Sequence, residues 1–390
     1  MSQEILSLRR NSEEFDSVLL NGTIRRHGEL WAAIPREIVR NHIGHSKRGK
    51  RSQLDERNDF GVPRESDPDN PLDSIIFETT RLTDRIRPSL LRVWFHSIRP
   101  ETLPLILLPS LTMAAYGLMR DWTASWGRGL AAFLGVVFFQ IAANALSDVN
   151  DHLRFVTLSG SLGSKNGVIQ KGWISAYQLR IIGYFSLGFG ILFGIPSVLM
   201  AGSKMILSIG GFTVLGILTY SGRPFGLKYR ALGEVLVLLL LGPFLCLGLC
   251  QSVFQQFDLG VLLLGLFFGS LACSVPHSSH LQDLEPRSPY KALTLASVLG
   301  FKLARHFFAV FYGFAFGTLG IATLLGYLPL RVLLLTCLGI PLIFLFFSIL
   351  YKASGPVSAL LSQLRSSAIK TYSFVGCLVF LSILISSVID

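Results

Sequence analysis

Two carboxylates three residues apart are the first side chains in this sequence whose types and spacing predict chemistry. Asp148 and Asp151 follow an almost wholly apolar run at residues 130–145. If that run is a helix that continues, both carboxylates lie on one face and can converge on one cation. Asn144 stands one turn before Asp148 and offers an amide oxygen. The alternative is that both aspartates merely end the helix in water.

A second acidic stretch contains Asp283 and Glu285, and Arg287 and Lys291 come directly after it. It also follows an apolar run. Carboxylates in such a place are costly unless they face a wet cavity lined by protein. Two carboxylate groups with cations beside them predict a divalent metal ion that holds a phosphorylated ligand.

Two histidines precede the second acidic stretch at helical spacing, His277 and His280. A transition-metal site is therefore an alternative. Histidine prefers softer ions than those that accompany phosphate chemistry, and this preference argues against the alternative.

Residues 160–175 form a glycine-rich segment that contains Lys165 and Lys171. Glycine lets backbone amides approach an anion closely, and the lysines add positive charge. The spacing is not that of a Walker loop. We expect these lysines to bind the phosphorylated ligand.

Residues 220–234 join two apolar runs and contain Tyr220, Arg223 and Lys228. Arginine can grip two diphosphate oxygens at once, and the face of a tyrosine ring stabilises a nearby carbocation. The alternative is an ordinary basic loop, which explains the charges but not the Tyr-Gly-Pro framework.

The composition indicates which elements position these residues. Half of the 390 residues (51%) are hydrophobic, only 15% are charged, and the mean hydropathy is +0.52. We therefore predict an all-α protein that crosses the lipid bilayer several times, since continuous apolar runs exclude a β-barrel. The net charge of +11 is explained by basic loops on the cytoplasmic side, so we expect no nucleic-acid partner.

Nine apolar runs are long enough to span a membrane. They lie near residues 102–119, 129–147, 178–200, 204–220, 231–251, 259–277, 303–326, 330–351 and 371–389. The connections that follow the second, fourth, sixth and eighth runs carry most of the lysines and arginines that lie between runs. Because basic loops face the cytoplasm, this predicts a cytoplasmic N-terminus and places both acidic stretches on the cytoplasmic face. We predict a bacterial inner membrane or an organellar membrane.

Residues 1–88 differ from the rest, because they are rich in charged and polar side chains. We expect a cytosolic, largely disordered N-terminal extension, followed by a membrane domain at residues 89–390. The alternative is that this extension docks on anionic lipids.

The order of these segments resembles the UbiA-type intramembrane prenyltransferases, and within them the branch that prenylates dihydroxynaphthoate in menaquinone synthesis. The resemblance covers residues 92–390. The matching stretches are Arg99-Pro-Glu-Thr102, Ser147-Asp-Val-Asn-Asp151, Val168-Ile-Gln-Lys-Gly-Trp-Ile-Ser175, Tyr220 through Glu234, and Asp283 through Gly300. The stretch from Tyr220 to Glu234 is the most specific of them.

This resemblance implies a nine-helix bundle with a central cavity open to the cytoplasmic side. It implies transfer of a prenyl group from a polyprenyl diphosphate to an aromatic quinone precursor, through Mg²⁺-assisted ionisation. The implied metal ligands are Asp148, Asp151, Asp283 and Glu285. The implied substrate-binding residues are Asn144, Lys165, Lys171, Arg223, Lys228, Arg287 and Lys291. The implied catalytic residues are Asp148, Asp151, Asp283 and Tyr220.

Several positions of the family's motifs are changed here. Ser147 replaces an asparagine, a third aspartate is missing after Asp151, and Arg287 replaces an aspartate. One metal ion can still be held, and Arg287 can neutralise diphosphate directly. The alternatives are a terpene cyclase, prenyl transfer to a non-aromatic acceptor, a degenerate member that binds isoprenoids without turnover, and a transporter.

Overall fold

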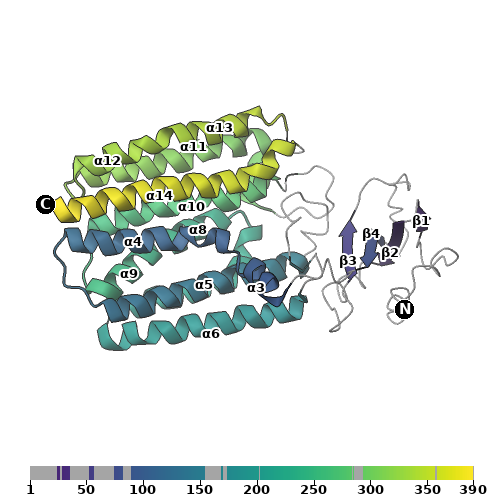
Figure 1. Cartoon of the computed structure of the whole chain (residues 1–390), viewed down its shortest axis with the longest axis horizontal. Helices are drawn as coiled ribbons and strands as arrows, with labels where there is room; N and C mark the ends of the chain where they lie inside the picture. Colours follow the sequence, from purple (N-terminus) through teal and green to yellow (C-terminus); the bar gives the residue numbers. More distant parts are fainter. Residues whose placement is uncertain are drawn as a thin grey trace. The chain divides into compact units, whose positions relative to one another are not determined.

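The computed structural model describes residues 24–26, 29–35, 52–56, 74–81, 89–153, 168–169, 174–201, 203–282, 284, 293–355 and 358–389 (Figure 1). The chain divides into two compact units. The first comprises residues 1–98, 148–182 and 288–290, and the second comprises residues 99–147, 183–287 and 291–390.

The first unit contains a small antiparallel sheet with the strand order β1-β2-β4-β3. Its strands are β1 (Ile24–Arg26), β2 (Glu29–Pro35), β3 (Ser52–Glu56) and β4 (Ser74–Arg81). They differ from the expectation of a largely disordered extension. β4 reads Ser-Ile-Ile-Phe-Glu-Thr-Thr-Arg, and such β-branched and aromatic residues favour strands. The rest of residues 1–88 lies outside the described part of the chain.

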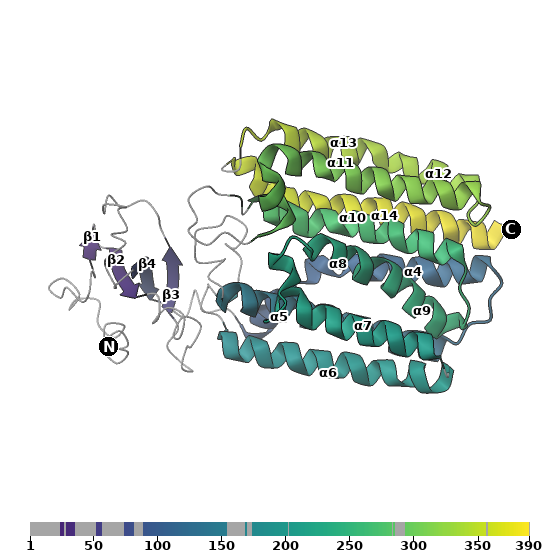
Figure 2. The same cartoon turned by 180° about the vertical axis from the view of Figure 1, so that it is seen from behind.

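The helices run across both units, and most of their residues lie in the second. They are α3 (Leu90–Ile98), α4 (Pro104–Met119), α5 (Trp126–Leu153), α6 (Ala176–Ala201), α7 (Lys204–Ser221), α8 (Gly233–Leu239), the π-helical turn η5 (Leu240–Phe244), α9 (Leu245–Phe254), α10 (Leu259–Gln282), α11 (Leu295–Leu324), α12 (Leu330–Thr336), α13 (Ile340–Lys352) and α14 (Leu364–Ile389). Figure 2 shows the same elements from behind.

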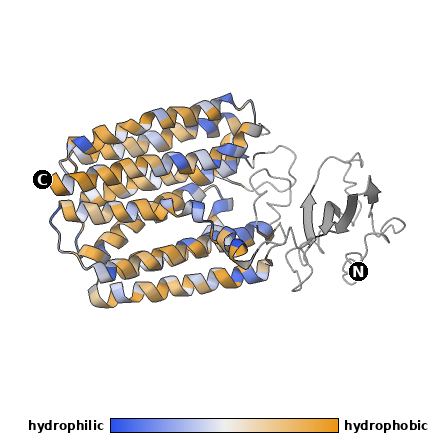
Figure 3. Ribbon diagram, viewed as in Figure 1, coloured by the Kyte–Doolittle hydropathy of each residue, from blue (hydrophilic) through white to orange (hydrophobic). Residues whose placement is uncertain are grey.

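Eight helical segments of the described residues are long and apolar enough to cross a membrane. A ninth is added when Leu91–Thr102 and Pro104–Met119 are taken as one bent span. Apolar residues predominate along these helices (Figure 3). The predicted all-α, multi-pass membrane architecture is confirmed, and the segments agree with the predicted apolar runs.

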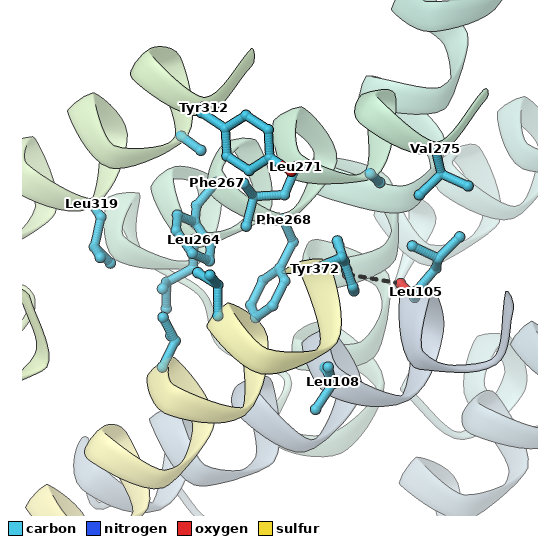
Figure 4. Packing of buried hydrophobic residues seen from close by; sticks show 14 of the residues in the cluster. Leu105, Leu108, Leu264, Phe267, Phe268, Leu271, Val275, Tyr312, Leu319 and Tyr372 are labelled. Atoms are coloured by element: carbon cyan, nitrogen blue, oxygen red, sulfur yellow. Dashed lines mark hydrogen bonds between the residues drawn. The ribbon is translucent and has the colours of Figure 1, made fainter. Parts of the chain in front are cut away.

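Helix α10 is the central helix of the second unit. In its most apolar stretch 78% of the residues are buried, against 22–44% in the other spans. It lies against α8, η5, α11 and α14. On α10, Phe268 packs against Tyr372 of α14, whose hydroxyl donates to the Leu105 carbonyl oxygen of α4 at 3.1 Å (Figure 4). The ring contact and the hydrogen bond together join three segments that are far apart in the sequence.

Glycines let the α8–η5 segment approach α10 closely. A Cβ atom added to Gly269 would collide with the Leu238 carbonyl oxygen, and one added to Gly242 would lie 2.5 Å from the Gly265 carbonyl oxygen. Small residues at four-residue spacing, here Gly265 and Gly269, allow such backbone contact between membrane helices. The close approach brings the start of α8 to the end of α10.

We expect Gly269→Ala to destabilise the second unit, because its new methyl group has no room beside the α8 backbone. The expected cost is about 1–3 kcal/mol, as for other overpacked cores. Gly317→Ala on α11 is the matched control, since a Cβ atom there would meet nothing within 4 Å. Thermal unfolding in detergent measures both. Equal midpoints for the two variants would contradict the close contact.

Candidate active site

Helix α5 carries the first acidic stretch. It runs without a break from Trp126 to Leu153, so the condition for a shared face is met and Asp148 and Asp151 lie three positions apart on one helix. Both side chains are half-buried.

Thr102 organises the polar side chains on α5 that precede these aspartates. Its hydroxyl donates to the Arg99 carbonyl oxygen at 2.9 Å and accepts from Asn144 Nδ2 at 3.0 Å and from Gln140 Nε2 at 3.3 Å. A hydroxyl has one donor and two acceptor positions, so all of them are used. Because Thr102 can only accept here, Asn144 presents its NH₂ group to Thr102 and its carbonyl oxygen points elsewhere.

Lys228 connects the loop between α7 and α8 with the end of α5. Its ammonium group lies 6.0 Å from the ring centroid of Tyr220 and 5.7 Å from that of Tyr229. It also donates to the Ser147 hydroxyl at 3.4 Å, and Ser147 immediately precedes Asp148. The cation is thus held by two aromatic faces at the predicted substrate-binding segment.

The backbone of this loop is fixed by its own contacts. Arg230 donates from Nη2 to the Pro224 carbonyl oxygen at 3.3 Å, and the Ala231 amide donates to the Leu293 carbonyl oxygen at 2.7 Å. The second contact brings the chain that follows the second acidic stretch to the loop. Arg223, in contrast, is exposed at the tip.

A buried polar cluster lies where α8 begins and α10 ends. Glu234 Oε1 is 3.0 Å from His277 Nδ1 and 2.9 Å from His280 Nδ1. His277 Nε2 donates to the Ala304 carbonyl oxygen of α11 at 2.9 Å, and the Cys273 thiol donates to the Glu234 carbonyl oxygen at 3.1 Å. The three titratable side chains of Glu234, His277 and His280 are at most 3% exposed.

The sequence analysis assigned no role to Glu234 and none to Thr102. The signal for Glu234 was a carboxylate at the very start of an apolar run, which in a membrane protein requires a partner. The described residues contain no group of three or more His, Cys, Asp or Glu side chains arranged to hold a metal ion. The transition-metal site at His277 and His280 stays an alternative from the sequence.

The remaining predicted site residues fall into two groups. Asn144 on α5, Tyr220 on α7 and Lys228 in the loop after α7 are described. The contact between Lys228 and Ser147 connects this loop with α5. The others lie outside the described residues, namely Lys165, Lys171, Asp283, Glu285, Arg287 and Lys291. For these the sequence-based roles stay predictions.

The donors on α5 fit a magnesium ion. Asn144, Asp148 and Asp151 supply hard oxygen atoms at positions one turn apart on a continuous helix, and Mg²⁺ prefers oxygen ligands and keeps several water molecules. A site with one or two protein carboxylates and a diphosphate is typical of this ion.

Comparison with known proteins identifies the family. The profile of the UbiA prenyltransferase family matches residues 107–364, which is more than half of the chain. The chain belongs to the UbiA prenyltransferase family. It is therefore a multi-pass membrane enzyme of the class that transfers prenyl groups, as the sequence analysis predicted.

Two UbiA relatives are 1,4-dihydroxy-2-naphthoate octaprenyltransferases. The protein from Haemophilus influenzae is 29% identical over 225 residues, which cover 54% of this chain and 70% of the relative. The protein from Mycobacterium tuberculosis is 26% identical over 214 residues, which cover 53% and 70%. These matches agree with the predicted branch of the family.

A solved structure shares the fold. A UbiA homolog from Archaeoglobus fulgidus bound to GPP and Mg²⁺ superposes with a TM-score of 0.56 at 13% identity, over 76% of this chain and 100% of that chain. The helical arrangement of this protein is thus that of a UbiA bundle.

We expect Thr102→Val to lower the stability of the second unit by about 1–3 kcal/mol, because Asn144 and Gln140 lose a buried acceptor. Thr102→Ser keeps the hydroxyl and is the control, with an expected midpoint close to wild type. Thermal unfolding in detergent measures the difference. A valine variant as stable as the serine variant would show that the three hydrogen bonds do not hold α5.

Proposed function

We propose that this protein transfers a prenyl group from a polyprenyl diphosphate to an aromatic quinone precursor similar to dihydroxynaphthoate. The placement of Lys228 is the observation that carries the proposal. Its ammonium group lies near the faces of Tyr220 and Tyr229 and contacts Ser147, the residue before Asp148. A cation beside two electron-rich rings suits a substrate with an anionic head and an allylic carbon that becomes positive.

Each side chain has a distinct role in the proposed reaction. Lys228 binds the diphosphate as a point charge, and Arg223, Lys165, Lys171, Arg287 and Lys291 complete the basic surroundings. Asn144, oriented by Thr102, contributes its amide oxygen. Tyr220 offers a ring face to the developing carbocation.

Asp148 and Asp151, with Asp283 and Glu285, would hold Mg²⁺. When bound, this ion draws negative charge from the diphosphate oxygens and makes diphosphate a better leaving group. The carbon–oxygen bond breaks with its electron pair on diphosphate, and an allylic carbocation results. An aromatic carbon of the acceptor attacks this carbocation and forms the new carbon–carbon bond. The ring then loses a proton, or its carboxylate as carbon dioxide, and becomes aromatic again. Helices that exclude water protect it from hydrolysis.

The acceptor is assigned from the relatives. The two proteins described above carry the name 1,4-dihydroxy-2-naphthoate octaprenyltransferase, and an aromatic hydroxynaphthoate is electron-rich enough to attack a carbocation. We infer the same acceptor class here, which places the reaction in menaquinone synthesis.

We also propose that the substrates enter from the cytoplasmic side, where the N-terminus lies. The α7–α8 loop contacts Leu293, and the Gln282 side chain at the end of α10 donates to the Leu361 carbonyl oxygen. Three basic connections therefore share one end of the bundle, as the positive-inside rule predicts for cytoplasmic loops.

Membranes that contain the protein, incubated with labelled geranylgeranyl diphosphate, Mg²⁺ and dihydroxynaphthoate, are expected to form a prenylated naphthoquinol. Asp148→Asn, Asp151→Asn and Asp283→Ala are each expected to lower the rate by about 10²–10³-fold, because charge stabilisation at the diphosphate is lost. Asp121→Asn is the control, since Asp121 is exposed and has no role in the proposal.

The same assay separates the alternatives. Cyclic hydrocarbon formed without acceptor indicates a terpene cyclase. Isoprenoid binding without release of diphosphate under any condition indicates a non-enzyme. Wild-type rates in the Asp148 or Asp283 variant remove that residue from the mechanism.

Lys228→Met is expected to raise the KM for the prenyl diphosphate by about 10–100-fold, the equivalent of one hydrogen bond to a charged group. Lys228→Arg keeps the charge and is expected to recover part of the affinity. Initial rates at varied prenyl diphosphate concentration and fixed acceptor concentration give the KM of each variant. An unchanged KM in the methionine variant would place the diphosphate away from the two tyrosines.

A further inference from the structure

The cluster of Glu234, His277 and His280 is unusual because three titratable side chains are buried together at the end of a membrane span. They are 3%, 0% and 3% exposed. An isolated carboxylate would be costly in such a place. The cluster joins α8, α10 and, through the Ala304 carbonyl oxygen, α11.

The hydrogen-bond partners determine where the protons lie. A carbonyl oxygen only accepts, so His277 Nε2 carries a proton that it donates to Ala304. The contact between His277 Nδ1 and Glu234 Oε1 needs one more proton, carried by either partner. In both arrangements the pair has no net charge. His280 then donates from Nδ1 to the same oxygen at 2.9 Å.

We propose that Glu234, His277 and His280 are positioning residues that fix the start of α8, and thereby the loop that carries Lys228, against the last turn of α10. This inference rests on the proposed function. His280 lies in the last turn of α10, three residues before Asp283, and Glu234 lies six residues after Lys228. The cluster therefore connects two segments that bind the same diphosphate in the proposed reaction.

The chemistry of the cluster favours positioning over simple stabilisation. A buried ionic or proton-sharing pair contributes little more to stability than apolar residues of equal volume would. It does require one geometry, because each donor needs its acceptor. The glycine contact lets the backbones of α8–η5 and α10 approach each other, and two hydrogen bonds to a single oxygen of Glu234 then require one geometry.

The test uses the full-length protein in detergent with Mg²⁺ and a labelled, non-hydrolysable geranylgeranyl diphosphate analogue. His280→Leu removes one hydrogen bond and is expected to raise the dissociation constant by about 10–100-fold, as loss of a supporting contact does at other sites. His280→Asn retains a donor at the place of Nδ1 and is expected to restore most of the affinity. His306→Leu on α11, where the ring is exposed, is the control and should bind as wild type does.

A second variant covers the case in which His280→Leu does not fold. The triple change Glu234→Leu, His277→Leu and His280→Leu leaves no unpaired polar group, so it is expected to keep the fold but to bind the analogue as weakly as His280→Leu. Wild-type affinity in either folded leucine variant overturns the inference, as does an asparagine variant that binds no better than the leucine variant. Failure of both leucine variants to fold would make the cluster structural and would overturn it too.

Failure of this inference is distinguishable from failure of the proposed function. If the wild-type protein does not bind the diphosphate analogue, the proposed function fails. If the wild-type protein binds and the folded leucine variants bind equally well, only the positioning role fails.

Discussion

The contact between the α8–η5 segment and α10 is the packing feature on which the second unit depends. Lipid offers no hydrogen bonds, so each polar group that is buried in a span must find its partner inside the protein. Gly242, Gly265 and Gly269 bring the two backbones together. Only because of this approach can Glu234 Oε1 reach the histidines of α10.

The central helix is held by a carboxylate at each end. At its start, Asp258 accepts from the Val261 amide at 3.1 Å and from the Tyr116 hydroxyl at 2.8–2.9 Å, and Arg120 lies 3.4 Å away. At its end, Glu234 Oε1 is hydrogen-bonded to two histidines. The first carboxylate comes from the helix's own N-terminus and the second from a neighbouring helix. Both ends of α10 are therefore fixed by polar contacts, and the apolar residues in the middle of the helix pack against the neighbouring helices.

Much of this arrangement was predictable from the sequence, because long apolar runs indicate membrane-spanning helices. The apolar run of α5 also had to be helical, since a span must satisfy its backbone hydrogen bonds within itself. The break at Gly242, inside a run predicted as one span, was not predictable, since it depends on the α10 backbone that lies against it. The partners of Glu234 were missed for the same reason. His277 and His280 are 43 and 46 residues away from it, whereas the spacing of residues in a sequence predicts only which side chains are neighbours on the same helix.

The orientation of the His280 ring affects which side chains can serve as metal ligands in a chain that has fewer acidic residues than the family's motifs. His280 occupies the polar position before Asp283, but its Nδ1 atom is used by Glu234 and is unavailable to a metal ion. In the proposed reaction the metal ligands are therefore oxygen atoms, including those of α5. There Thr102 sets the amide of Asn144, and Lys228 contacts Ser147, where the family's motif has an asparagine. If the protein binds a diphosphate as proposed, Lys228 supplies fixed positive charge where the family's motif has an amide.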